Sequence, residues 1–231
     1  MRQSLNHVSI IMDGNNRWAK SKGISSREGH KEGVKKARLA VEFALENKID
    51  YLTLFAFSTE NWLRDTAEVN DLVSLFFDAL EEQTPKLIEE KVKLNFIGDI
   101  SRFNRRLIER IKKSSKETEN SNPELNLIIA ASYGGKWDII NSINKTISSN
   151  KLKEISESDL EKNLETKEFP DPDLIIRSGG EKRLSNFYLW QSSYSELYFS
   201  DKFWPDFEKD DLQMACEDYF KRKRKFGAKS G

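Results

Sequence analysis

The sequence has few of the residues that define several protein classes. It holds a single cysteine, Cys216, which excludes a disulfide framework and favours a reducing compartment. No apolar run approaches the roughly 18 residues that a transmembrane helix needs, and the N-terminus lacks the apolar core of a signal peptide. Positive and negative side chains both number 38, so no net field draws nucleic acid to the chain. We therefore expect a soluble, cytoplasmic protein that binds no nucleic acid and makes at most a peripheral contact with the inner face of a membrane.

Short apolar runs alternate along the chain with segments of helical periodicity. Strands are predicted at 7–12, 51–57, 92–97, 125–131 and 173–177. Helices are predicted at 31–48, 69–90, 101–117, 136–149, 156–165 and 208–224, with Gly29-His30 and Ser101 at the starts of the first and third. Strands separated by helices of this length are joined by crossovers. The pattern predicts an α/β fold, with a largely parallel central sheet flanked by helices, and a single domain that spans residues 1–231.

The segment at 69–90 is more apolar than one buried helix face requires. Its apolar residues are Val69, Leu72, Val73, Leu75, Phe76, Phe77, Ala79 and Leu80. Packing against the sheet accounts for part of this set. The excess either lines an internal apolar channel or packs against a second subunit.

The most informative polar residues follow the first predicted strand. Asp13 ends the apolar run, and the segment Gly14-Asn15-Asn16-Arg17-Trp18 comes directly after it. A carboxylate at the carboxyl end of a strand, beside free N–H groups and a guanidinium, is where an α/β fold holds a phosphate and a divalent cation. An ordinary Asx turn is the alternative interpretation of Asp13-Gly14-Asn15 taken alone.

Two further polar segments also follow predicted strands. Phe57-Ser58-Thr59-Glu60-Asn61-Trp62-Leu63-Arg64 comes after the second strand, and Arg177-Ser178-Gly179-Gly180-Glu181-Lys182-Arg183-Leu184-Ser185 comes after the last. The arginines, glycines and hydroxyls of the later segment suit a diphosphate cradle, because a guanidinium donates two parallel bonds to phosphate oxygens. The alternatives are a capped turn for the earlier segment and a solvated Gly-Gly turn for the later one.

Two single residues carry weaker signals. Glu196 is a carboxylate in an apolar and aromatic neighbourhood, where either a cation or an arginine would pair with it. His30 lies at an expected helix start, where an anion would be stabilised, although a plain surface histidine fits as well.

Together, and in this order, these segments resemble the cis-prenyltransferases. The matching text is Ile11-Met12-Asp13-Gly14-Asn15 with Arg17-Trp18-Ala19, Gly29-His30, Phe57-Ser58-Thr59-Glu60-Asn61-Trp62 with Arg64, Asn126-Leu127-Ile128, Tyr133-Gly134-Gly135, Asp173-Leu174-Ile175-Ile176-Arg177, Gly179-Gly180-Glu181, Arg183, Ser185-Asn186-Phe187 and Glu196-Leu197-Tyr198-Phe199. The resemblance implies a homodimeric, Mg²⁺-dependent enzyme with an apolar tunnel. Such enzymes condense an allylic diphosphate, usually farnesyl diphosphate, with successive isopentenyl diphosphates and release pyrophosphate at each addition.

The product implied by the resemblance is a long-chain polyprenyl diphosphate, the precursor of a lipid carrier for cell-wall sugars. A synthase that stops at a short or medium chain is one alternative. A non-catalytic partner subunit is another, although the positions of Asp13, Asn61 and Arg177 are intact.

The resemblance also assigns roles to single residues. It implies that Asp13 and Glu196 bind Mg²⁺ and that Asp13 and Asn61 are catalytic. Asn61 matches the position commonly given the proton-removal step, but an amide is a poor base and released pyrophosphate is an alternative acceptor. The residues implied around the allylic diphosphate are Gly14, Asn15, Asn16, Arg17, Trp18, Arg27, His30, Ser58, Thr59, Glu60, Trp62 and Arg64. Those implied around isopentenyl diphosphate are Arg177, Arg183, Leu184 and Ser185.

The chain departs from the family pattern at three places. Asn16 stands where a glycine is usual, and asparagine tolerates left-handed geometry. Ser26 stands at the position of a phosphate-binding arginine, so we expect Arg27 to take that role through a shifted loop or allylic binding to be weaker. The basic ending Arg222-Lys223-Arg224-Lys225-Phe226-Gly227 has Lys225 in place of an arginine and therefore lacks the bidentate fork.

Overall fold

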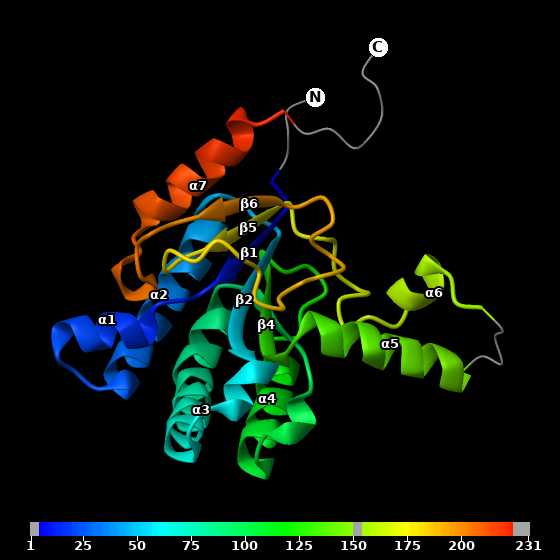
Figure 1. Ribbon diagram of the computed structural model, residues 1–231, viewed down its shortest axis with the longest axis horizontal. Coiled ribbons are helices and arrows are strands. Elements are labelled where there is room, and N and C mark those ends of the chain that lie inside the picture. The colour runs from blue at the N-terminus through cyan, green and yellow to red at the C-terminus, as the bar shows by residue number, and fades with distance from the viewer. Residues whose placement is uncertain (1–4, 150–153, 224–231) are drawn as a thin grey trace.

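Six parallel strands form the centre of the molecule (Figure 1). The computed structural model describes residues 5–149 and 154–223. The strand order is β3-β4-β2-β1-β5-β6, and every neighbouring pair is parallel. The strands are β1 (His7–Ile11), β2 (Tyr51–Ser58), β3 (Val92–Ile97), β4 (Leu125–Tyr133), β5 (Leu174–Arg177) and β6 (Glu196–Phe199). The predicted α/β fold is confirmed, and the five predicted strands correspond to β1–β5.

Helices connect the strands as the predicted crossovers require. They are α1 (Asn15–Lys22), α2 (Ser26–Glu46), α3 (Thr66–Glu89), α4 (Arg105–Glu117), α5 (Gly135–Ser149), α6 (Glu157–Glu161) and α7 (Lys209–Lys221). Short 3₁₀ helices lie at η1 (Thr59–Leu63), η2 (Ile100–Arg102) and η3 (Trp204–Asp206). Within the described residues, no helix is long and apolar enough to cross a membrane.

Two predicted helix starts are wrong because better capping residues lie nearby. Helix α2 begins at Ser26, where the Ser25 side chain accepts from Glu28 N in a capping box, and not at Gly29-His30. Helix α4 begins after Asn104, whose side chain accepts from Leu107 N, because Ser101 belongs to η2. The sequence does not predict α1, since Asn15 and Asn16 favour turns, or β6, which has only four residues.

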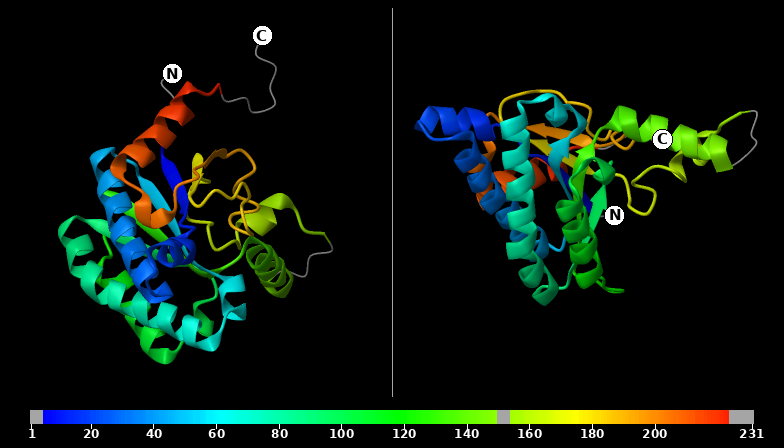
Figure 2. Two further views of the ribbon diagram at one scale, coloured as in Figure 1. Left: turned by 60° about the vertical axis from the view of Figure 1, so that its left-hand side comes forward. Right: turned by 90° about the horizontal axis from the view of Figure 1, so that it is seen from below.

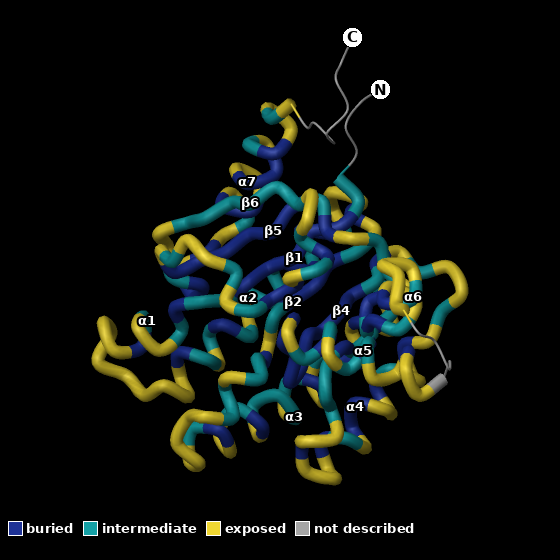
Figure 3. The backbone as a smooth tube through the Cα atoms, turned by 45° about the vertical axis from the view of Figure 1, so that its right-hand side comes forward, coloured by how far each residue is buried: buried dark blue, intermediate teal, exposed yellow. Residues whose placement is uncertain are grey.

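The two faces of the sheet are covered differently. Helices α2, α3, α4 and α7 pack on one face, which we call the helix face, against side chains such as Val8, Ile10 and Leu54. Residues 178–195 and the start of α5 cover the other face, which we call the loop face, through Phe187 and Tyr188. The strands are largely buried and the outer turns of the helices are exposed (Figure 3). Alternate residues of each strand thus contribute to two separate cores.

One part of the chain leaves this layered arrangement. Helices α5 and α6 extend away from the sheet as an arm (Figures 1 and 2). The arm presents Ile140 and Ile147 to solvent, each 58% exposed, on the same face of α5. Large exposed isoleucines at this spacing are typical of a helix that packs against another surface.

Candidate active site

Three of the polar segments predicted from the sequence meet at one edge of the sheet. Strand β1 lies between β2 and β5, and Ile11 pairs with both Phe55 and Arg177. The residues that follow these three strands therefore leave the sheet side by side at its carboxyl end. This is the edge at which open parallel sheets bind ligands.

Asp13 lies at the centre of this edge. Arg177 Nη2 donates to Asp13 Oδ2 at 2.9 Å, and Arg17 Nη2 approaches the same oxygen at 3.2 Å. The backbone of Asp13 is fixed by Ser178, whose hydroxyl accepts from Asp13 N at 2.9 Å. Gly179 permits this close approach, because a Cβ there would lie 2.8 Å from Arg17 Nη2 and its φ is +92°. The two segments form one unit around a single carboxylate.

Arg177 also connects Asp13 to the segment after β5. Its side chain is nearly fully buried, and its Nη1 donates to Ser185 Oγ at 2.7 Å and to the carbonyl of Arg183. Its Nε is buried and has no hydrogen-bond partner. Glu181 forms ion pairs with both Arg17 and Arg183. Carboxylates thus hold three guanidinium groups close together. Clustered guanidinium groups are suitable donors for a phosphate.

The segment after β2 adds groups from the other side. Asn61 Oδ1 accepts from Ser58 N at 2.8 Å and so caps η1. Asn186 Nδ2 donates to Glu60 Oε1 at 2.7 Å. Burial alone would raise the pKa of Glu60, but hydrogen bonds from Asn186 and neighbouring groups outweigh it and lower the pKa. Glu60 is therefore ionised at neutral pH.

His30 lies inside α2 and not at its start, so the predicted helix-terminus anion site is corrected. Burial, and then the nearby Arg64, lower the pKa of His30 to about 4, which keeps the ring neutral. Its Nε2 is buried without a hydrogen-bond partner. Beside it, the Glu68 carboxylate accepts from Asn16 Nδ2 at 2.9 Å and from Arg64 Nη1 at 2.7 Å.

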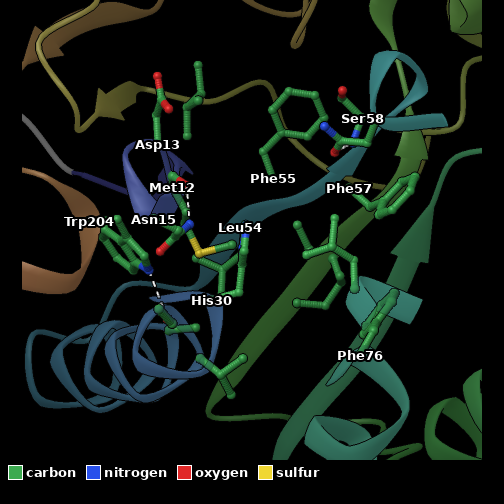
Figure 4. A pocket seen from close by; sticks show the side chains of 18 of the residues that line it. Met12, Asp13, Asn15, His30, Leu54, Phe55, Phe57, Ser58, Phe76 and Trp204 are labelled. Carbon is green, nitrogen blue, oxygen red and sulfur yellow. Dashed lines mark hydrogen bonds between the residues drawn. The ribbon is translucent and has the colours of Figure 1, made fainter. Parts of the chain in front are cut away.

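These polar groups surround the entrance of an apolar cavity of about 810 Å³. We call the polar end the mouth; it is formed by Asp13, Asn16, Arg17, Arg64, Arg177 and Arg183. Figure 4 shows Asp13 and Phe76 on opposite sides of the cavity, with Leu54 of β2 between them. Further in, the wall is formed by α2, α3 and the helix face of the sheet, with Leu72, Leu75, Phe76, Ala79, Leu80, Leu87, Leu94, Leu127 and Ile129.

The depth of the cavity follows the length of α3. Leu72 and Leu87 both line it, and a helix rises about 22 Å between these positions. The channel interpretation of the predicted 69–90 helix therefore holds for this face of α3. Phe77 does not line the cavity; the Arg106 guanidinium lies over its ring, 4.0 Å from the centroid. The adjacent phenylalanines thus belong to different environments.

Most of the residues predicted to bind substrate line the cavity. They are Asp13, Gly14, Asn15, Asn16, Arg17, His30, Ser58, Glu60, Asn61, Arg64, Arg177, Arg183 and Ser185. Asn16 lies in the first turn of α1 with an ordinary φ, so the left-handed geometry expected of it is not needed. Gly14 is the residue with the positive φ, at +103°.

The remaining predicted residues lie outside the cavity wall. Trp18 Nε1 donates to Asp206 Oδ1 at 2.7 Å. Arg27 Nη1 donates to Asp71 Oδ1 at 3.0 Å, so in this structure α3, and not the cavity, engages the guanidinium expected to replace the missing arginine. Both residues are close in sequence to the mouth but have protein partners of their own.

Thr59, Trp62 and Leu184 have supporting positions. Thr59 Oγ1 donates to Glu60 Oε2 at 3.1 Å. Trp62 Nε1 donates to Ser132 Oγ at 3.0 Å, and its ring packs against Phe57. Leu184 packs against the core of the loop face. These residues hold the segments that carry the mouth.

Within one chain, Glu196 does not lie near Asp13, so the predicted metal site with both carboxylates does not form there. Glu196 pairs with Leu174, and Leu174 pairs with Val8, so Glu196 lies at the opposite end of the sheet from Asp13. Val8 lies about 10 Å before Ile11 along β1, and Asp13 lies beyond Ile11. Glu196 instead accepts from Arg222 Nη1 at 2.7 Å. The other possibility raised by the sequence, an arginine partner, is the observed one.

Asp13 itself suits a divalent cation. Both arginines reach Oδ2, and no hydrogen bond reaches Oδ1 from the described residues. Those residues hold no cluster of three or more metal-ligating side chains. Mg²⁺ commonly binds through one or two carboxylates together with phosphate oxygens and water, so a single carboxylate beside a phosphate cradle is sufficient.

Three residues of the site have structural roles that the sequence did not predict. Asn186 lines the cavity and bonds Glu60, Ser178 fixes the Asp13 backbone, and Glu68 holds Asn16 and Arg64. Ser178 and Asn186 adjoin residues that were selected. Glu68 gave no signal, because an acidic residue in the first turn of a helix is ordinary. The basic ending from Arg224 onward lies outside the described residues.

Comparison with known proteins gives consistent similarities. A family model described as "Putative undecaprenyl diphosphate synthase" matches residues 11–227. The ditrans,polycis-undecaprenyl-diphosphate synthase ((2E,6E)-farnesyl-diphosphate specific) of Yersinia pseudotuberculosis is 48% identical over 230 residues, covering 97% of this chain and 91% of its own.

Two solved structures share the architecture. Lavandulyl diphosphate synthase from Lavandula x intermedia, in complex with dimethylallyl diphosphate, has a TM-score of 0.93 at 37% identity and covers 96% of this chain and 98% of its own. A probable undecaprenyl diphosphate synthase from Campylobacter jejuni has a TM-score of 0.82 at 35% identity and covers 98% of this chain and 100% of its own.

Proposed function

Because the chain belongs to the undecaprenyl diphosphate synthase family of cis-prenyltransferases, we propose that it converts farnesyl diphosphate and successive isopentenyl diphosphates into undecaprenyl diphosphate. It is an enzyme, a prenyltransferase that makes a polyprenyl diphosphate. One observation carries the proposal: a ring of guanidinium groups around Asp13 opens into a deep apolar cavity. This arrangement can hold diphosphate groups at the mouth and a growing hydrocarbon chain inside.

In this proposal, Arg17 and the first turn of α1 hold the allylic diphosphate. Ionisation of that substrate places negative charge on the departing diphosphate, and fixed N–H and guanidinium donors stabilise it. Mg²⁺, when bound, would neutralise part of the same charge as a Lewis acid. Asp13 would hold the cation through its oxygen Oδ1, which accepts no hydrogen bond from the described residues. Arg177 keeps the Asp13 carboxylate oriented through Oδ2.

The isopentenyl diphosphate would occupy the cradle of Arg177, Arg183 and Ser185. Because Arg177 touches both Asp13 and Ser185, the two diphosphates would lie side by side. Side-by-side binding brings the allylic carbon and the double bond together without diffusion. The apolar wall behind them keeps water from the allylic cation.

Asn61 is poorly placed to remove the proton that ends each addition. Its Oδ1 already accepts from Ser58 N at 2.8 Å, and a neutral amide is a weak base. We assign Asn61 to holding η1 at the mouth. The released pyrophosphate, held by the same arginines, is the proton acceptor in this account.

The proposal extends to assembly and location. We propose that residues 1–231 act as one catalytic domain and that two copies form a homodimer. The exposed Ile140 and Ile147 on the α5 arm support an interface there, and sedimentation of the parent chain tests it. We place the enzyme in the cytoplasm, in peripheral contact with the inner face of the membrane that receives its apolar product.

Burial raises the pKa of the Cys216 thiol to about 11, so this cysteine is inert.

A shorter product is the main alternative, and one observation favours it. The structure with the higher TM-score of the two is a lavandulyl diphosphate synthase. The depth of the cavity between α2 and α3, which continues past Leu80 to Leu87, supports a long chain instead. A non-catalytic partner subunit is disfavoured because the mouth keeps Asp13, Arg17 and Arg177 together.

The deciding experiment incubates the protein with farnesyl diphosphate, labelled isopentenyl diphosphate and Mg²⁺, and separates the products by chromatography. The proposal predicts a ladder that ends at a long polyprenyl diphosphate. Asp13→Asn keeps the side-chain shape and should lower turnover by about 10²–10³-fold. A parent enzyme that transfers no prenyl group, or an Asp13→Asn variant with ordinary turnover, would contradict the proposal.

A further inference from the structure

The Glu68 carboxylate is hydrogen-bonded to polar groups of the mouth that the family resemblance assigns to the allylic diphosphate. Asn16 Nδ2 and Arg64 Nη1 both donate to its Oε1, at 2.9 Å and 2.7 Å. Asn16 is held in turn by Ser26, whose hydroxyl donates to Asn16 Oδ1 at 2.5 Å. His30 lies within electrostatic range of the Glu68 carboxylate. A carboxylate thus lies where amide, guanidinium and imidazole groups converge.

The groups of this cluster carry the charges expected of a phosphate site in which the anion is already bound. Burial alone would raise the pKa of Glu68, but hydrogen bonds from Asn16 and Arg64 outweigh it and lower the pKa, so the carboxylate is ionised at neutral pH. His30 is neutral there and presents a buried Nε2 without a partner. A carboxylate and a phosphate share a negative charge and several acceptor oxygens. Donors arranged for one suit the other.

We propose that Glu68 is a built-in substitute for a substrate phosphate: it holds the donors of Asn16 and Arg64 in the free enzyme and gives them up when the allylic diphosphate binds. When pyrophosphate leaves, the carboxylate takes the donors back. This inference rests on the proposed function and names a competing residue at the same site.

The exchange has two physical consequences. The donors stay in place between turnovers, because the Glu68 carboxylate accepts from both Asn16 and Arg64. Each diphosphate must also displace a resident anion, which lowers its apparent affinity by the fraction of time that the donors are free. The substitute therefore weakens the hold on pyrophosphate after each addition.

Glu68 also couples the mouth to the cavity wall. It lies in the first turn of α3, and the same helix carries Leu72, Leu75 and Phe76 along the cavity. Asn16 belongs to α1 and Ser26 to α2, so the hydrogen-bonded chain joins the first turns of three helices. Displacing Glu68 releases α3 from this junction.

The direction in which diphosphate affinity changes when Glu68 loses its charge distinguishes competition from a supporting role of Glu68. If Glu68 merely positions Arg64 for the substrate, removing its charge weakens diphosphate binding. If Glu68 competes with the substrate, removing its charge strengthens binding. Glu68→Gln keeps the shape and one acceptor oxygen, and so removes the charge alone.

The test measures binding of inorganic pyrophosphate to the full chain by titration calorimetry. We expect Glu68→Gln to lower the Kd for pyrophosphate about tenfold, the effect of losing a charge-assisted competitor. Glu82→Gln is the matched control, because it removes the same charge from an exposed position further along α3. We expect its Kd to equal that of the parent. The difference should persist at high salt, which screens long-range charge effects but not direct contacts.

An unchanged or higher Kd in Glu68→Gln would overturn the inference, as would an equal gain in Glu82→Gln. Thermal melting of both variants checks that they are folded. Failure of the proposed function gives a different result, because the parent would then make no polyprenyl product in the chain-length assay whatever its affinity for pyrophosphate.

Discussion

The two faces of the sheet are both covered by apolar and aromatic residues but are packed differently. On the helix face, α2 and α3 stand apart and leave a cavity of about 810 Å³ lined by leucines and Phe76. On the loop face, Phe187 stacks on Tyr188 with ring centroids 4.2 Å apart and on Phe55 at 4.5 Å. The helix face therefore contains space for a ligand, whereas the loop face is closely packed.

The polar groups of the two faces differ in the same way. On the loop face, His7 is hydrogen-bonded to Pro170 O at 2.6 Å and to Thr53 Oγ1 at 2.8 Å, and Tyr133 donates to Asp138 at 2.9 Å. Each face also has a buried side-chain atom without a partner: Gln191 Oε1 on the loop face, and His30 Nε2 and Arg177 Nε at the mouth. His30 and Arg177 line the cavity and Gln191 does not, so only the unpaired atoms at the mouth lie where a ligand could satisfy them.

The loop face also holds the diphosphate cradle in position. Ser185, Asn186 and Tyr188 all have positive φ, which is unfavourable for residues with side chains. Phe187 and Tyr188 are fully buried in the loop face and fix this segment. Ser185 in turn contacts Arg177. Rigid packing on one face therefore supports the diphosphate cradle at the edge of the sheet.

The largest expected effect on stability comes from a substitution in the core of the loop face. Phe187→Ala removes a ring that is fully buried between two others and should lower the free energy of unfolding by about 3–5 kcal/mol. Urea denaturation measures it. The variant should also bind isopentenyl diphosphate more weakly, because Ser185 and Asn186 lose their support. A loss below about 1 kcal/mol would show that the loop face is not tightly packed.

The next prediction uses the only two histidines, one on each face. Burial lowers the pKa of both His7 and His30 to about 4, below the unfolded value of 6.5, so folding favours their neutral forms. Each contribution to stability is complete above pH 6.5 and is lost as pH falls toward 4, up to roughly 3 kcal/mol apiece. His7→Gln and His30→Gln should each flatten this decline in denaturation curves.

The two histidine variants should differ at pH 7. His7→Gln disrupts a hydrogen-bonded network and should cost about 1–3 kcal/mol there, whereas His30→Gln removes a ring with an unpaired nitrogen and should cost less. Asp138, whose pKa is raised by burial, contributes a slope of opposite sign that both variants retain. Equal costs at pH 7 would remove the distinction between the two faces.

The smallest expected effect on stability comes from the cavity wall. Phe76 is only half-buried and already borders a cavity, so Phe76→Ala should cost less than loss of a fully buried ring, about 1–2 kcal/mol, while shifting the products to longer chains. Phe77→Ala is the matched control, because Phe77 packs against Arg106 and does not line the cavity. Its product ladder should match that of the parent. A common ladder for both variants and the parent would mean that α3 does not limit the chain.

The sequence predicts what depends on neighbouring residues and fails where distant segments decide. Asp13, Ser58 and Arg177 each lie at or just beyond the end of an apolar strand, so their convergence could be predicted from the alternation of strands and helices. The partner of Glu196 could not, because the register of β6 against β5 places it at the far end of the sheet. The direction of Arg27 depends on Asp71 in another helix. The divergence of α2 and α3 that opens the cavity is likewise a tertiary property.

One measurement tests whether the helix face holds the hydrocarbon chain. A farnesyl diphosphate analogue with a photoreactive diazirine at its tail would be bound in the dark, irradiated and mapped by peptide mass spectrometry. We predict labels on α3 between Leu72 and Leu87 and on facing residues of α2, and none on residues 184–191. Labels concentrated on the loop face, with α3 unmarked, would contradict the account.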